Sequence, residues 1–131
     1  MILLDTDICI AILKGNEQVL SHRARYSGAV AISFMTAAEL FYGAHKSQRA
    51  GENLVTVEQF LISIDILHSE QRILEKFGAL KATLEKVGTR LADADLFIAA
   101  TALTKCDALV TGNTRHFSRI EGLRVENWLV P

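Results

Sequence analysis

The residues that decide the fold are Ile2-Leu3-Leu4-Asp5-Thr6-Asp7, at the start of the chain. A short apolar run of this kind predicts a strand that is buried on both faces. The polar residues that follow end the strand, and Thr6 or Asp7 is expected to cap a helix over Ile8–Leu13. Asp5 would then lie at the carboxyl end of a strand, which is where an open α/β sheet presents its ligands.

The same alternation of strands and helices continues along the chain. Further strands are expected at Ala29–Phe34, Ile64–Leu67, Ala108–Thr111 and, near the edge, Leu123–Val125. Helices are expected at Glu17–Tyr26, Thr36–Lys46, Leu54–Ile64 and Glu70–Lys86, with Ser69 as N-cap of the last, and a further helix follows Asp93 and Asp95. This alternation predicts an α/β protein with a central parallel sheet flanked by helices on both faces.

The composition agrees with one folded domain over residues 1–131. Half of the residues are hydrophobic, 22% are charged and only one is proline, so a disordered chain is excluded. The mean hydropathy is +0.22, but no apolar run approaches the roughly 20 residues of a membrane span. The start of the chain does not resemble a signal peptide, and Cys9 and Cys106 have no CxxC spacing. We therefore expect a cytoplasmic protein with no membrane contact and with free, buried thiols.

The charge balance limits how the protein binds its partners. Fourteen Lys and Arg residues face fifteen Asp and Glu residues, which gives a formal net charge of −1. Binding to a nucleic acid through overall positive charge is therefore excluded. Local basic residues remain available, and Arg90, Arg115, His116 and Arg119 are candidates to border the site.

A set of oxygen-bearing side chains marks the candidate site. Asp5, Glu39, Asp95 and Asn113 come from separate segments, and each maps to the end of a strand or to the start of a helix. We expect them to share one rim of the sheet, where close carboxylates repel one another unless a cation lies between them. Hard oxygen ligands favour Mg²⁺ or Mn²⁺. Asp7 and Asp93 are interpreted as auxiliary acids or helix caps.

Each of these residues also has a purely structural interpretation. Asp5 suits a helix cap, and Glu39 has the spacing of a capping-box partner for Thr36. Asp95 favours a helix N-terminus electrostatically, and Asn113 is a common turn residue. The residues taken singly leave both interpretations open.

Five stretches in order resemble one family along essentially the whole chain. They are Leu3-Leu4-Asp5-Thr6, Thr36-Ala37-Ala38-Glu39-Leu40-Phe41-Tyr42-Gly43, Asp95-Leu96-Phe97-Ile98-Ala99-Ala100, Val110-Thr111-Gly112-Asn113-Thr114-Arg115-His116-Phe117 and Gly122-Leu123-Arg124-Val125-Glu126-Asn127-Trp128. Together they resemble the PIN-domain ribonuclease toxins of the VapC family, which pair with an antitoxin in type II toxin–antitoxin systems.

The resemblance implies a PIN-like fold and a metal-dependent endoribonuclease. It assigns metal binding to Asp5, Glu39 and Asp95, and it places Asn113 at the fourth catalytic position. It also implies Mg²⁺ or Mn²⁺ as cofactor, a VapB-type antitoxin as partner, a tRNA or other structured RNA as substrate, and a homodimer. Thr6 and Thr111 are suited to support the carboxylates, and Arg115 and His116 to contact RNA. Phe41, Tyr42 and Phe60 are candidate interface aromatics.

Three other classes of protein share some of these features. A haloacid-dehalogenase-type phosphatase also begins with a strand and Asp-x-Asp, as in Asp5-Thr6-Asp7, but the residues that should follow are replaced by Ile8 and Cys9. A phosphoacceptor receiver domain lacks its lysine after Val110. A non-catalytic PIN-like binding module is disfavoured because Glu39 and Asp95 are both retained. These features favour the nuclease.

Overall fold

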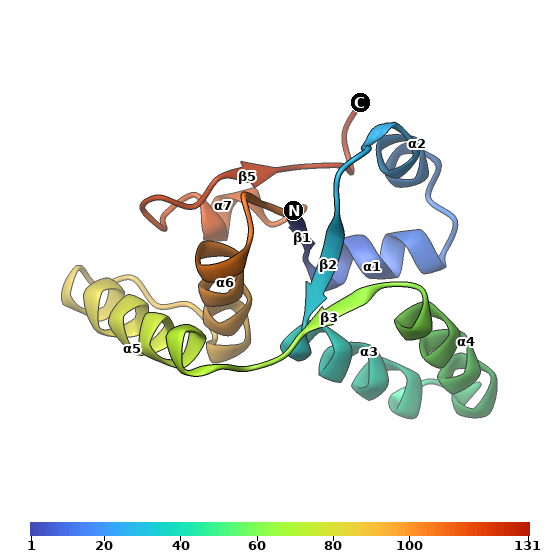
Figure 1. The fold of residues 1–131 in the computed structure, drawn as a ribbon. Helices are drawn as coiled ribbons and strands as arrows, with labels where there is room; N and C mark the ends of the chain where they lie inside the picture. Colours follow the sequence, from blue (N-terminus) through green and yellow to red (C-terminus); the bar gives the residue numbers. More distant parts are fainter.

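The computed structural model describes all residues, 1–131, as a five-stranded parallel sheet with helices on both faces (Figure 1). The strands are β1 (Ile2–Leu4), β2 (Val30–Ser33), β3 (Asp65–Leu67), β4 (Ala108–Val110) and β5 (Val125–Glu126), in the order β3-β2-β1-β4-β5. All four pairings are parallel. The predicted fold class is confirmed, and β5 lies at the edge as expected.

Seven helices complete the fold. They are α1 (Thr6–Leu13), α2 (Glu17–Arg25), α3 (Phe34–Lys46), α4 (Ala50–Ile62), α5 (Gln71–Lys86), α6 (Asp93–Lys105) and α7 (Thr114–Phe117). No helix is long and apolar enough to cross a membrane. In Figure 1, α1 to α4 lie on one side of the sheet, and α5, α6 and α7 lie on the other.

Side-chain alternation along the central strands divides the core in two. Ile2 and Leu4 of β1 pack in one cluster with residues of α1, α2, α3 and α4. Leu3, between them, packs in the second cluster with residues of α5, α6 and α7. Because successive side chains of a strand point to opposite faces, a continuous apolar run is needed here. The apolar run Ile2–Leu4 meets this need, as predicted for a strand that is buried on both faces.

Several predicted helix starts are wrong. The helix expected at Ile8–Leu13 begins at Thr6, and its N-cap is Asp5 rather than Thr6 or Asp7. The helix expected at Thr36 begins at Phe34 and is capped by Ser33, whose Oγ accepts from the Thr36 N–H at 3.1 Å. Glu70, not Ser69, occupies the N-cap position of α5 and makes no side-chain cap. β1 and β2 thus run into their helices sooner than the polar residues suggest, whereas α5 begins one residue later than expected.

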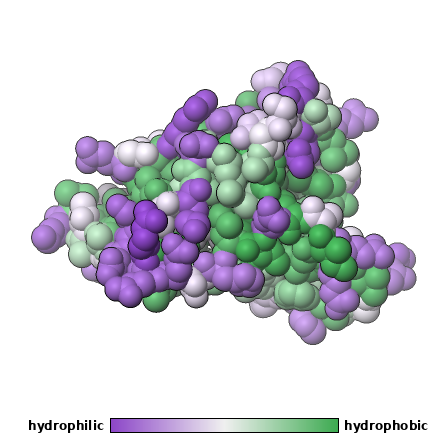
Figure 2. Space-filling model, viewed as in Figure 1, coloured by the Kyte–Doolittle hydropathy of each residue, from purple (hydrophilic) through white to green (hydrophobic).

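Two other details differ from expectation. The helix expected from Leu54 begins at Ala50, so the polar segment before it is partly helical. Cys9 is buried as expected, whereas Cys106 is only half-buried; both are free thiols. Figure 2 shows apolar side chains gathered over β3 and the adjoining parts of α3 and α4. At the end of α4 the Ile62 side chain is 87% exposed.

Candidate active site

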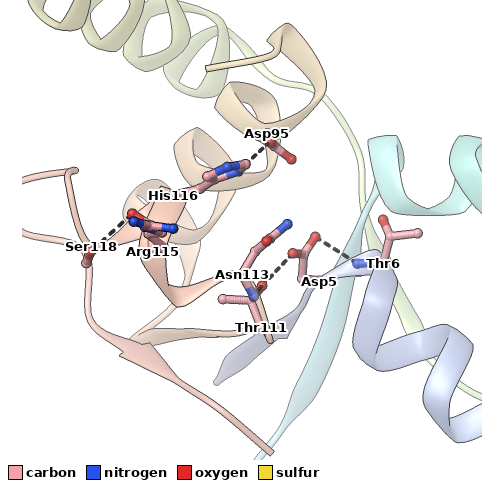
Figure 3. Close-up of polar contacts among 8 residues, drawn as sticks. All are labelled: Asp5, Thr6, Asp95, Thr111, Asn113, Arg115, His116 and Ser118. Carbon is pink, nitrogen blue, oxygen red and sulfur yellow. Dashed lines mark hydrogen bonds and ion pairs between the residues drawn. The ribbon is translucent and has the colours of Figure 1, made fainter. Parts of the chain in front are cut away.

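Asp5 lies at the centre of the site and is held through both carboxylate oxygens (Figure 3). It follows the central strand β1 and is only 5% exposed. Its Oδ1 accepts from the Thr6 N–H at 2.8 Å, and its Oδ2 accepts from the Thr111 hydroxyl at 2.7 Å. Thr111 follows β4, which pairs with β1. The helix-cap interpretation is therefore correct, and the same carboxylate also faces the neighbouring strand.

Glu39 is joined to Asp5 through one residue. Its Oε1 accepts from the Thr6 hydroxyl at 2.7 Å, and the Thr6 N–H contacts Asp5. Glu39 lies on α3, after β2, and its side chain is half-buried. The capping-box interpretation of Glu39 is wrong, because α3 begins at Phe34 and Glu39 lies beyond its first turn. The carboxylate instead faces the site.

Asp95 comes from the other side of the sheet, in the first turn of α6. Its side chain is 25% exposed, and its Oδ2 lies 3.9 Å from Nδ1 of His116. Figure 3 shows the His116 ring reaching toward this carboxylate. His116 belongs to the short helix α7, which directly follows Asn113. The structure thus brings one of the two candidate RNA contacts next to a candidate metal ligand.

Asn113 is placed by Thr111. The fully buried Thr111 hydroxyl donates to Asp5 and accepts from the Asn113 N–H at 3.0 Å. Asn113 occupies the N-cap position of α7, but its side chain makes no cap. The side chain is exposed, so its amide remains available beside Asp5. Thr111 is the support for the site that the sequence suggested.

Asp7 ties α1 to the turn after β4. Its Oδ2 accepts from the Gly112 N–H at 2.8 Å, and its buried Oδ1 has no hydrogen-bond partner. A Cβ at position 112 would clash with Leu129 Cδ1 and lie 2.8 Å from Asp7 Oδ2. A larger residue at position 112 would therefore force the side chains of Leu129 and Asp7 to move. Asp7 holds the backbone that carries Thr111 and Asn113.

Two predicted residues lie further from this cluster. Asp93 is the first residue of α6 and forms an ion pair of 2.9 Å with Lys81 of α5. No hydrogen bond or ion pair joins Asp93 to the other acids. Arg115 is exposed, and its carbonyl accepts from the Ser118 hydroxyl at 3.3 Å (Figure 3). Asp93 thus links two helices, and the side chain of Arg115 is free at the rim.

Burial, and to a smaller extent the neighbouring charges, raises the pKa values of three carboxyl groups of the cluster. Burial raises the pKa of Asp5 to about 6, against the hydrogen bonds from Thr111 and Thr6, and the charges of Asp7 and Asp95 raise it further. Burial also raises the pKa of Asp95, with His116 opposing and Glu39 and Asp7 reinforcing the shift. Burial raises the pKa of Asp7 as well. The charges of neighbouring acids therefore reach both Asp5 and Asp95.

The shift of Asp5 predicts that the metal-free protein loses stability as the pH rises. The pKa of Asp5 is about 6 in the fold against 3.8 when unperturbed, so between these values the folded state binds more protons than the unfolded chain. The free energy of unfolding then falls across this window, by about 3 kcal/mol for this group. Urea unfolding at a series of pH values measures the slope. An Asp5→Asn variant with the wild-type slope would contradict the assignment.

The donor set fits a divalent cation of the Mg²⁺ type. No three Asp, Glu, His or Cys side chains lie close enough to bind one ion together. Mg²⁺ ordinarily takes one or two carboxylates and keeps several waters, so three direct ligands are not required. The buried Oδ1 of Asp7 without a partner and the raised pKa of Asp5 both indicate negative charge that the protein itself does not neutralise.

A groove leads away from Glu39. It has a volume of about 290 Å³ and lies between α1, α3 and α4. Its apolar lining includes Leu13, Leu40 and Val57, and Glu39 lies at its edge together with Lys14. Any chain segment bound in this groove would therefore lie against a carboxylate of the cluster.

The sequence reasoning missed two residues that support the site. Ser33 and Thr36 are both fully buried, and the Thr36 hydroxyl lies 3.0 Å from that of Thr6. Ser33 caps α3 through its side chain. The only sign of this role in the sequence is that two hydroxyl residues follow the apolar segment Val30–Ile32. That they contact Thr6 becomes clear only from the parallel pairing of β1 with β2.

Comparisons with known proteins agree with this geometry. The PIN domain family model matches residues 2–123. Ribonuclease VapC2 of Haemophilus influenzae is 38% identical over 97% of both chains, and the tRNA(fMet)-specific endonuclease VapC of Shigella flexneri is 37% identical over 96% of both. Among solved structures, VapBC2 of Rickettsia felis bound to a promoter DNA fragment matches with a TM-score of 0.91 and 32% identity, over 98% of this chain and 99% of that chain. VapBC of Salmonella typhimurium also gives 0.91, with 34% identity over 97% of both chains.

Proposed function

This chain belongs to the PIN domain family, and from this premise we propose that it is an endoribonuclease toxin whose carboxylates act with Mg²⁺ or Mn²⁺. The observation that carries the proposal is that Thr6 donates hydrogen bonds to two acids, from its N–H to Asp5 and from its hydroxyl to Glu39. Asp95 lies near enough to raise the pKa of Asp5. The matched relatives that are named ribonucleases and endonucleases supply the reaction class. Neither the phosphatase nor the non-catalytic module is favoured by any of these observations.

The proposed hydrolysis assigns different roles to the acidic residues and to the threonines of the site. Asp5, Glu39 and Asp95 would hold the cation between them, one or two directly and the rest through its bound water, and Asn113 offers an uncharged amide beside them. Thr6 and Thr111 fix the carboxylate oxygens that they contact. A bound divalent cation lowers the pKa of water and stabilises negative charge on phosphate oxygens. Because the set needs no Ser, Cys or His nucleophile, direct attack by water on the phosphodiester is the matching chemistry.

The rim supplies an arginine and a histidine side chain for contact with the RNA backbone. His116 lies beside Asp95, and Arg115 is exposed next to it. Contacts of this kind position a nucleic acid without reading its sequence. The formal charge of −1 therefore does not prevent RNA binding at this rim. We assign both side chains to the phosphates that flank the cleaved bond.

The partner is an antitoxin of the VapB type. The similar solved structures include VapBC complexes, and the groove between α1, α3 and α4 offers an apolar surface that ends at Glu39. An antitoxin segment in this groove would cover part of the carboxylate cluster. The homodimer and the cytoplasmic location stay predictions.

Cleavage of total cellular RNA by the purified protein in buffer with Mg²⁺ tests the proposed activity. Internal cuts in tRNA or another structured RNA, seen as discrete fragments on denaturing gels, are the expected result. A single-stranded DNA of matched sequence serves as the control substrate. Progressive shortening from one end, or intact RNA at protein concentrations in excess of substrate, would refute the endoribonuclease assignment.

A further inference from the structure

Three hydroxyl groups lead from the interior of the protein to Glu39. The Thr6 hydroxyl lies 2.7 Å from Glu39 Oε1 and 3.0 Å from the Thr36 hydroxyl. The Ser33 hydroxyl lies 3.5 Å from that of Thr36. Ser33 and Thr36 are both 0% exposed, so water does not compete for these contacts. The three residues connect the end of β2 and the start of α3 to the first residue of α1.

The direction of these hydrogen bonds follows from counting protons. Each hydroxyl has one proton to donate, and an ionised carboxylate can only accept. Thr6 therefore donates to Glu39, which leaves Thr36 to donate to Thr6. Ser33 then points its proton toward Thr36 over the longest of the three distances. All three donors are aligned toward the carboxylate, an arrangement in which each hydrogen bond polarises the next.

The Thr36 hydroxyl hydrogen-bonds to Thr6 and not to the backbone of its own helix. A threonine in a helix often donates to the carbonyl four residues earlier, as Thr101 of α6 does to Phe97 O at 2.8 Å. Thr36 makes no such bond and faces Thr6 instead. With Thr36 as its donor, the Thr6 hydroxyl is held toward Oε1 of Glu39. The other oxygen, Oε2, accepts no hydrogen bond within the protein and remains for a ligand.

We propose that Thr36 is a positioning residue for the site. Although it hydrogen-bonds to no carboxylate itself, it fixes Glu39 through Thr6 and thereby sets the affinity of the cluster for a divalent cation. The inference rests on the proposed function, because it assigns the free oxygen of Glu39 to that cation. Supporting residues that orient metal ligands typically contribute 10- to 100-fold in affinity.

Calorimetric titration of the RNA-free protein with Mn²⁺ tests the proposal without relying on cleavage. Thr36→Val keeps the shape and removes the hydroxyl, and we expect it to weaken Mn²⁺ binding about tenfold. Thr36→Ser keeps the hydroxyl and should stay within about twofold of wild type. Thr101→Val removes an equally buried hydroxyl that does not contact Ser33, Thr36 or Thr6, and it should leave the Mn²⁺ affinity unchanged. Equal Mn²⁺ affinities of Thr36→Val and wild type would overturn the proposal.

A double-mutant cycle with Thr6→Val separates positioning from a general structural effect. If Thr36 acts through Thr6, its substitution causes no further loss once the Thr6 hydroxyl is absent. Additive losses would therefore also overturn the proposal. Thr36→Ala replaces Thr36→Val in the cycle if circular dichroism shows that the valine variant does not fold. A wild-type protein that binds no Mn²⁺ would refute the proposed metal site itself, which is a distinguishable result.

Discussion

The Asp5→Asn variant is expected to lose RNA cleavage by about 10³-fold or more and, at the same time, to be more stable than wild type in metal-free buffer near neutral pH. Asp5 is the most buried acid of the cluster and has a pKa of about 6. Its ionised form is therefore unfavourable in the metal-free fold. Asparagine removes that charge and still accepts from the Thr6 N–H as an N-cap. We expect the melting temperature to rise by about 5 °C.

Asp65→Asn is the matched control for this variant. Asp65 is exposed at the first residue of β3, at the opposite end of the parallel sheet from the site. Its substitution should change neither cleavage nor the melting temperature. Gel assays of RNA cleavage and thermal unfolding measured on the same preparations decide the outcome. Cleavage by Asp5→Asn at the wild-type rate, or a melting temperature below wild type, would contradict the role assigned to Asp5.

Removal of divalent cations is expected to reduce cleavage to background, and added Mg²⁺ or Mn²⁺ should restore it. The cluster offers carboxylate oxygens as ligands, and the proposal assigns the Thr6 and Thr111 hydroxyls to supporting Glu39 and Asp5 rather than to attack on the RNA. Without a cation, the carboxylates would also repel the phosphates of the RNA. Cleavage is measured after dialysis against EDTA and again after each metal is returned.

Circular dichroism of the dialysed protein provides the control for this experiment. The sheet and helices are held together by two apolar cores, and no group of three Asp, Glu, His or Cys side chains within them could hold a metal ion. The EDTA-treated protein should therefore keep its helical signal while it is inactive. Full cleavage in the presence of EDTA would refute the metal dependence and leave the RNA-cleaving assignment intact.

The sequence predicted the architecture well because burial on both faces leaves a clear pattern. The apolar run Ile2–Leu4 predicts a central strand, and the structure shows its residues divided between two cores. The position of Asp5 follows directly, since the residue after such a strand lies at the carboxyl edge of the sheet. Glu39 and Asp95 are then brought to the same edge by the helices that follow β2 and precede β4.

Local capping rules were less successful, and the reason is physical. Thr36 and Glu39 have the spacing of a capping box, but Ser33 caps α3 because β2 leads straight into that helix. This frees Thr36 and Glu39 for contacts with Thr6, which is 30 and 33 residues away in the sequence. Such contacts depend on which strands pair. Local residue preferences carry no information about that pairing.

The hydrogen bond between Thr111 and Asp5 spans 106 residues, and this has a consequence for the timing of synthesis. While the ribosome is still making the chain, β1 and β2 are present long before β4. Asp5 then lacks Thr111, and Asp7 lacks the Gly112 backbone that it holds. Contacts so distant in sequence form late in folding. A nascent chain therefore lacks the completed cluster until Thr111 and Gly112 have been translated, and the proposed RNA cleavage is not expected before that point.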